Sequence, residues 1–175
     1  MDGACMREAN RVRVQELGAI ATKAVTFTAS GTVAKPIFKV TGSVEVLSLY
    51  GIVTTEIGSN HTAAHWRLND QTATNVVISA AAGTTISSLP AGSLLVRIGL
   101  VASALSVVTA AAANIIDPIG ATAPSFFMPF TITQKTGSIE TDIEYVYSTN
   151  NTSLGAMTFY IGYVPLTPDA SVQPY

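Results

Sequence analysis

Hydrophobic and polar residues alternate along most of this chain, with the period of two that a β-strand requires. The first example is the stretch AVTFTAS at 24–30, where Val25 and Phe27 alternate with threonines. Such a pattern places one row of side chains in a core and the other row in solvent. Comparable stretches predict strands within 36–58, 62–70, 74–103, 126–148 and 156–166.

Turn-forming residues separate the predicted strands. Gly42 and Gly51 predict turns or bulges, breaks at 82–83 and 90–92 divide the middle of the chain into three short strands, and 117–125 (DPIGATAPS) predicts a loop. Roughly eight to ten strands follow one another at intervals of about 8–15 residues, with no helical pattern between them. The chain is therefore predicted to be all-β, an antiparallel β-sandwich or barrel.

Residues 1–23 lack the strand pattern and predict an N-terminal arm, in which Glu, Ala, Gln and Leu favour one short helix. The β-sandwich domain is expected over 24–175. Residues 1–39 hold six of the nine basic residues and three of the eleven acidic ones, so they carry about +3 and the rest about −5. With a net charge of −2 for the whole chain, nothing indicates a nucleic-acid partner.

The composition indicates how the surface is used. Charged residues make up 11% of the chain and hydrophobic residues 48%, and the mean hydropathy is +0.40. Ordinary globular proteins contain about 25% charged residues. A surface with so few charges is typical of a subunit that its neighbours cover, so we expect this chain to associate with itself or with other proteins.

One stretch, Gly99–Ile116, is uncharged over 18 residues. It is rich in Ser, Thr, Ala and Val and has no basic cluster or aromatic belt at its ends, which favours a buried strand with its loop over a membrane span. The single cysteine, Cys5, has no second cysteine to pair with, and the start MDGACMREANRVRV lacks the apolar region of a secretory signal. Folding is therefore expected not to depend on an oxidising compartment, and no membrane partner is expected.

The two histidines of the chain, His61 and His65, stand four residues apart in HTAAHW. On a helix this spacing would place both imidazoles on one face, as in zinc sites. The surrounding residues favour a strand instead, where two such residues share a face but lie about 13 Å apart, too far to bind one ion. No metal site is predicted.

Acidic residues occupy one face of the most regular predicted strand. Glu140, Asp142 and Glu144 alternate there with hydrophobic or hydroxyl-bearing residues, namely Ile139, Thr141, Ile143, Tyr145 and Tyr147. Carboxylates about 7 Å apart would suit glycoside hydrolysis or a calcium ion. Three acids on one strand face more often form a solvated or interface face, and this is the interpretation we favour.

No other residue pattern predicts a reaction. Cys5 has no histidine beside it in the sequence, and the chain contains no G-x-S-x-G, G-x-G-x-x-G or Walker A motif. We predict that the protein is not an enzyme and has no catalytic, cofactor-binding or metal-binding residues.

Aromatic residues gather in the last third of the chain. They are Tyr145, Tyr147, Phe159, Tyr160 and Tyr163. Such a group would serve either as a platform for a sugar or as cross-strand pairs in the core. We favour the core.

The segment 135–172, KTGSIETDIEYVYSTNNTSLGAMTFYIGYVPLTPDASV, resembles the C-terminal part of small virion proteins of tailed bacteriophages. The similarity includes a step of the form Y-x-P-L, here Tyr163 to Leu166. It implies a virion structural protein with a β-sandwich or jelly-roll fold, in the first place a capsid decoration or cement subunit. Such a subunit would form a homo-oligomer, preferably a trimer, on the lattice of major capsid protein, after assembly in the host cytoplasm. The alternative is a tail or head-fibre protein with a carbohydrate- or receptor-binding sandwich.

The chain closes on FYIGYVPLTPDASVQPY, residues 159–175. Phe159, Ile161 and Tyr163 are predicted on one face of a last strand, which Pro165 ends because proline offers no N–H to a neighbour. Further prolines favour an extended tail. Because this ending is apolar, we expect Tyr175 to lie near a contact with another subunit.

Overall fold

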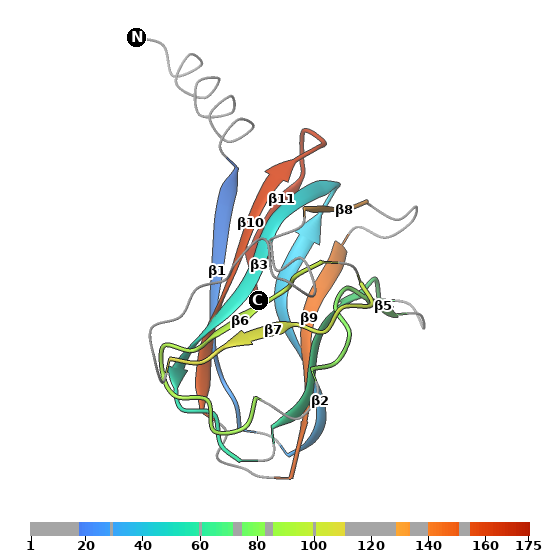
Figure 1. Cartoon of the computed structure of the whole chain (residues 1–175). Coiled ribbons are helices and arrows are strands. Elements are labelled where there is room, and N and C mark those ends of the chain that lie inside the picture. Colours follow the sequence, from blue (N-terminus) through green and yellow to red (C-terminus); the bar gives the residue numbers. More distant parts are fainter. Residues whose placement is uncertain are drawn as a thin grey trace.

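The structure, a computed structural model, describes residues 18–28, 30–59, 61–71, 75–82, 86–99, 101–110, 129–133, 140–150 and 155–175. These residues form strands, turns and loops arranged as two sheets (Figure 1). No helix in this part of the chain is long and apolar enough to cross a membrane. The predicted loop at 117–125 lies outside the described residues.

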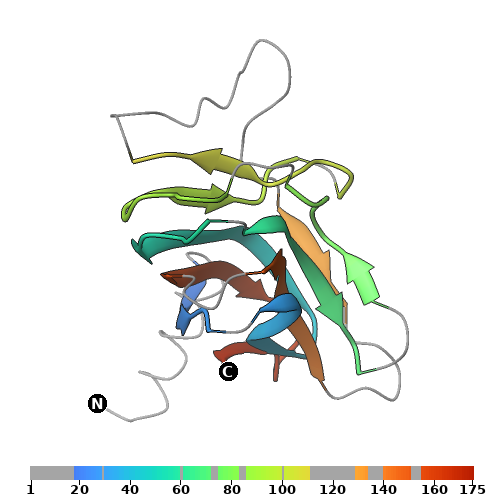
Figure 2. The ribbon, with the colours of Figure 1, turned by 90° about the horizontal axis from the view of Figure 1, so that it is seen from below.

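Sheet A contains six strands. In spatial order its main path is β1 (Ala19–Thr26), β10 (Ala156–Pro165), β3 (Val44–Thr55), β6 (Leu94–Val96) and β7 (Ser106–Val108). The remaining strand, β8 (Phe130–Ile132), pairs with the first residues of β3. Figure 2 shows this succession from the yellow β7 through the teal β3 to the red-brown β10.

Sheet B contains five strands. Their spatial order is β11 (Ser171–Pro174), β2 (Gly31–Thr41), β9 (Glu140–Thr149), β4 (Thr62–Asn69) and β5 (Asn75–Val77). The long strands β2 and β9 pair over almost their whole length, from Gly31 opposite Thr149 to Thr41 opposite Glu140. These two strands form the longest ladder of sheet B.

The pairings follow the order of a jelly roll. Four antiparallel pairs are nested in the sequence: β1 with β10, β2 with β9, β3 with β8, and β4 with β5. This is the order of one long double-stranded ribbon rolled up so that successive pairs alternate between two sheets. The predicted all-β antiparallel β-sandwich is therefore confirmed.

The core lies between the two sheets and is built by the period of two. In β9, Ile143, Tyr145 and Tyr147 point inward and are at most 2% exposed, and in β10 the same holds for Phe159 and Ile161. Burying one such large side chain contributes about 1.5–3 kcal/mol to folding. The aromatic group predicted for the core is thus placed correctly, with the exception of Tyr160, which lies on the outer face of sheet A.

Two glycines that the sequence marks as breaks behave differently. Gly42 occupies the predicted turn between β2 and β3, with a positive φ of 70° that favours glycine. Gly51 lies inside β3, so the predicted turn or bulge at this position is wrong. A Cβ atom there would stand 2.7 Å from the terminal Cε of Met157 and 3.1 Å from the Phe159 ring, so a larger residue would require these side chains to shift.

The remaining predictions concern the arm and the middle of the chain. Residues 19–23, assigned to the arm, form the first part of β1, and residues 1–17 lie outside the described part. Of the three short strands predicted in the middle, the first and last correspond to β5 and β6, whereas 86–88 form a turn. Within the uncharged stretch Gly99–Ile116, β7 forms a half-buried strand at one edge of sheet A.

Candidate functional site

The two histidines do not share a face, contrary to the prediction. A bulge between Thr62 and His65 in β4, where Ala63 has a positive φ of 54°, adds one residue to the strand and shifts its alternation. His61 is consequently fully buried between the sheets. The ring of His65 lies on the outer side, where its Nδ1 is 2.8 Å from the carbonyl oxygen of Ala63.

His61 is part of an aromatic cluster in the core. Its Nε2 lies 3.2 Å from the hydroxyl of Tyr145, its ring stacks on Tyr147 at 4.5 Å, and the Phe27 ring approaches it edge-on at 5.2 Å. Burial lowers the pKa of His61 to about 4, because charge is unfavourable in this apolar environment. His61 is therefore a neutral core residue at physiological pH.

The outer face of sheet B carries the predicted row of acids. We call this surface the charged face; it comprises Lys39, Arg67, Asn69, Gln71, Glu140, Asp142, Glu144 and Tyr175. Asp142 is 3% exposed and Glu144 is 4% exposed, so the prediction of a solvated or interface face is wrong for these two residues. Side chains of the same chain cover them.

Each buried acid on the charged face accepts hydrogen bonds from side chains outside β9. Arg67 donates from Nε to Glu144 at 2.6 Å, and the amide of Asn69 donates to the other carboxylate oxygen at 3.0 Å. Gln71 donates its side-chain amide to Asp142. A buried carboxylate requires such partners, since an unpaired charge away from water is strongly destabilising.

Tyr175 completes this network from a distant part of the sequence. After β10 the chain turns at 166–169 and returns as β11 along the edge of β2, so the tail is extended only from 171 onward. The Tyr175 hydroxyl donates to Asp142 at 2.6 Å, and Nζ of Lys39 lies 5.2 Å from the ring centre. Burial and the hydrogen bond to Asp142 raise the pKa of the Tyr175 phenol. Tyr175 therefore contacts side chains of its own chain.

This arrangement defines what the charged face can do chemically. The carboxylates of Asp142 and Glu144 already accept two hydrogen bonds each. Among the described residues, no group of three or more His, Cys, Asp or Glu is placed to hold a metal ion. The network therefore acts as a structural lock that fastens β4, β9 and β11 together.

The outer face of sheet A has the opposite character. Cross-strand neighbours form three rows there that contain no charged residue. The first row is Ala24, Thr158, Ile52, Leu94 and Val108; the second is Thr22, Tyr160, Tyr50, Val96 and Ser106; the third is Ile20, Gly162 and Ser48. Glu45, opposite Val164, carries a charge in a further row.

Exposure within these rows is greatest over β1. Ile20 is 74% exposed, and Thr22 and Ala24 are exposed beside it, whereas Val96 at the β6 side is fully buried. We call the part of the rows on β1, β10 and β3 the neutral face; it comprises Ile20, Thr22, Ala24, Ser48, Tyr50, Ile52, Thr158, Tyr160 and Gly162. A neutral, partly apolar surface of this kind loses little solvation when a partner covers it.

The centre of the neutral face is a pair of tyrosines. Tyr50 and Tyr160 are directly opposite in the ladder, and their rings stack with centroids 4.9 Å apart and planes 9° from parallel. Burial, and secondarily Tyr160, raises the pKa of Tyr50. Rings stacked in this way cover one face of each other, whereas a sugar platform needs open ring faces. The pair is better suited to a protein contact than to sugar stacking.

The sequence alone did not identify either face completely. Tyr50 lies in a predicted strand, but its partner Tyr160 is 110 residues away and only the register brings the two rings together. Comparison of the chain with protein-family profiles, with curated proteins and with solved structures finds no match. What the protein does must therefore be inferred from its own two faces.

Proposed function

We propose that this protein is a structural subunit of a virion, in the first place a capsid decoration or cement protein. The observation that carries this proposal is the neutral face of sheet A. It presents exposed Ile20 and a stacked tyrosine pair on an uncharged sheet surface, while the acids of the opposite sheet are locked within the chain. Such a surface supports association by burial of neutral area and offers no reacting groups.

The fold is compatible with this role without establishing it. Jelly rolls build capsid proteins, lectins and cupins alike, so the fold restricts the function only weakly. The resemblance of 135–172 to small phage virion proteins favours the capsid among these options. In this proposal the subunits form a homo-oligomer, preferably a trimer, which contacts the major capsid protein.

The second function considered from the sequence, recognition of a carbohydrate or receptor by a fibre tip, receives less support. It would use an exposed aromatic platform, but Tyr145, Tyr147 and Phe159 lie in the core and Tyr160 stacks on Tyr50. The described aromatic residues thus offer no flat pair of open rings.

Mass spectrometry of purified virus particles tests the virion assignment directly. Particles from lysates of the source of this gene should contain the protein at an abundance comparable to that of the major capsid protein. Its absence from washed particles, with the protein present in the soluble fraction of the same lysate, would overturn the assignment.

A further inference from the structure

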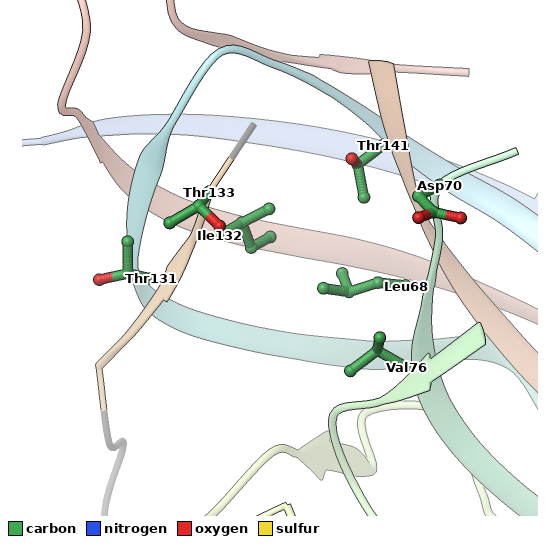
Figure 3. Close-up of a pocket in the computed structure, with 7 residues that line it drawn as sticks. All are labelled: Leu68, Asp70, Val76, Thr131, Ile132, Thr133 and Thr141. Atoms are coloured by element: carbon green, nitrogen blue, oxygen red, sulfur yellow. The ribbon is translucent and has the colours of Figure 1, made fainter. Parts of the chain in front are cut away.

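A pocket opens between the two sheets, on the side of the sandwich where β5 and β8 are neighbours (Figure 3). Its volume is about 250 Å³. The residues around it are Leu68, Asp70, Val76, Thr131, Ile132, Thr133 and Thr141. Leu68 and Val76 come from sheet B and Ile132 from sheet A, so the pocket is a place where the core is accessible from outside.

The lining of the pocket selects a particular chemistry. Three aliphatic side chains form an apolar wall, three threonines provide hydroxyl groups, and Asp70 supplies the only charged group among the described residues that line the pocket. A long cationic side chain matches this combination, because its methylene stem packs on apolar surface while its head meets a carboxylate. The volume suits one or two side chains rather than a ligand of drug size, whose pockets are about 300–1,000 Å³.

A segment with matching chemistry exists in the same sequence. Residues 11–14 read Arg-Val-Arg-Val, and no other place in the chain alternates arginine with valine. In an extended conformation this segment presents arginines on one side and valines on the other. It precedes Gly18 and belongs to residues 1–17, outside the described part of the chain.

The position of β1 brings this segment to the correct end of the sandwich. Across sheet A, Ala19 in β1 pairs with Tyr163 in β10, Tyr163 pairs with Val46 in β3, and Val46 pairs with Phe130 in β8. The start of β1 and the pocket are therefore at the same end, at opposite edges of sheet A. Three strand spacings of about 4.8 Å separate these edges.

The geometry favours an arm from another subunit. Within one chain, the arm would have to cross the turns at 42–43 and 166–170, which lie between β1 and β8 and are joined by a hydrogen bond from Ser43 N to Thr167 Oγ1. An arm from a neighbour reaches the open side of the pocket without this obstacle. The neutral face also needs a second contact: nine positions on three strands cover about 300 Å² in projection, against about 800 Å² per partner in a stable interface.

We propose that residues 11–14 of one copy bind in this pocket of a neighbouring copy, with an arginine on Asp70 and a valine against Leu68, Val76 and Ile132. This inference rests on the proposed function, since an assembly is what brings a neighbour's arm within reach. The partner is a second copy of this chain, and the contact is an exchange of arms.

Disulfide trapping between two full-length variants tests the exchange. Both variants carry Cys5→Ser; one adds Val12→Cys in the arm, and the other adds Thr133→Cys at the exposed rim of the pocket. After mixing and mild oxidation, the proposal predicts a disulfide-linked heterodimer on non-reducing gels. Mass spectrometry should identify the peptide that joins positions 12 and 133. The matched control replaces Thr133→Cys with Thr28→Cys, an exposed threonine just beyond the other end of β1.

The proposal predicts at least fivefold more heterodimer with the pocket cysteine than with the control, and a decrease when Asp70→Asn is added. Equal yields for both positions would overturn it. A double variant with Val12→Cys and Thr133→Cys in one chain that gives only an internal disulfide would overturn the exchange between copies. Neither negative result bears on the virion assignment, which depends on the presence of the protein in particles.

Discussion

The outer faces of the two sheets differ in chemistry: sheet B carries buried acids with hydrogen-bond partners, whereas sheet A carries uncharged and partly exposed side chains. Both are formed by long antiparallel strands whose other side builds the core. On sheet B, two buried acids are satisfied by Arg67, Asn69, Gln71 and Tyr175 of the same chain. On sheet A, three rows of neighbours carry no charge, and Ile20 is 74% exposed.

The comparison shows that charge on a surface does not by itself indicate a site of interaction. The acids of sheet B are the most conspicuous polar feature of the sequence, yet their hydrogen bonds are made within the fold. The uncharged face attracts less attention in the sequence, but in the proposed assembly it is the face that a partner covers. A partner that covers this face would displace water from side chains that form few hydrogen bonds with that water.

The largest expected effect comes from breaking the charged face. Arg67→Met should lower the free energy of unfolding by about 3–5 kcal/mol, because it leaves the buried carboxylate of Glu144 without its charged partner. Chemical denaturation at pH 7 measures this change. Lys39→Met is the matched control: it removes the exposed pair with Glu140, formed at 2.9 Å, and should cost at most about 1 kcal/mol.

Replacing both partners sharpens this test. The double variant Arg67→Met with Glu144→Met should recover most of the lost stability, because no unpaired charge remains buried. If Arg67→Met proved no more harmful than Lys39→Met, the buried network would not be the lock described above.

The next effect concerns the core that both faces share. Burial lowers the pKa of His61 to about 4 in the folded protein, against an ordinary value of 6.5. The unfolded chain therefore takes up a proton at higher pH than the folded one, and stability should decrease as the pH falls from about 6.5 to about 4. The expected loss over this range is about 3 kcal/mol.

A His61→Phe variant isolates this contribution from other groups that titrate in the same range. Denaturation curves at several pH values should show a smaller loss of stability for the variant than for the original protein. Identical pH dependence in the two proteins would contradict the assignment of His61 as a neutral core residue.

A smaller effect is expected at the edge of the charged face. Tyr175→Phe keeps the ring near Lys39 but removes the hydrogen bond to Asp142, and should lower the free energy of unfolding by about 1–2 kcal/mol. Hydrogen exchange at the amides of β11 should increase in parallel. Unchanged stability and exchange would show that Tyr175 does not fasten the strand.

The sequence predicted the features that depend on local alternation. The inward residues of β9 and β10, the turn at Gly42 and the end of β10 at Pro165 all follow from period, turn chemistry and proline geometry. Because each strand needs one buried face, these patterns are sufficient to assign an antiparallel sandwich.

The features that the sequence did not predict depend on register and on distant contacts. The bulge at Ala63 reverses the alternation of β4 and buries His61, although nothing in HTAAHW marks it. Asp142 in β9 accepts hydrogen bonds from Gln71 and Tyr175, which are far away in the sequence. Pairing of Tyr50 with Tyr160 likewise requires the register of β3 and β10.

The central claim is that the protein associates through the neutral face and not through the charged face. Two exposed threonines on the outer sides of opposite sheets, Thr22 and Thr32, allow a matched comparison. Each lysine substitution should change the stability of the subunit by no more than about 0.5 kcal/mol, as is usual for exposed positions.

Light scattering coupled to gel filtration measures the outcome. The account predicts an oligomer for the original protein and for Thr32→Lys, and a shift of Thr22→Lys to the monomer at the same concentration. An oligomer that survives Thr22→Lys but dissociates with Thr32→Lys would contradict the account, as would a monomer for the original protein.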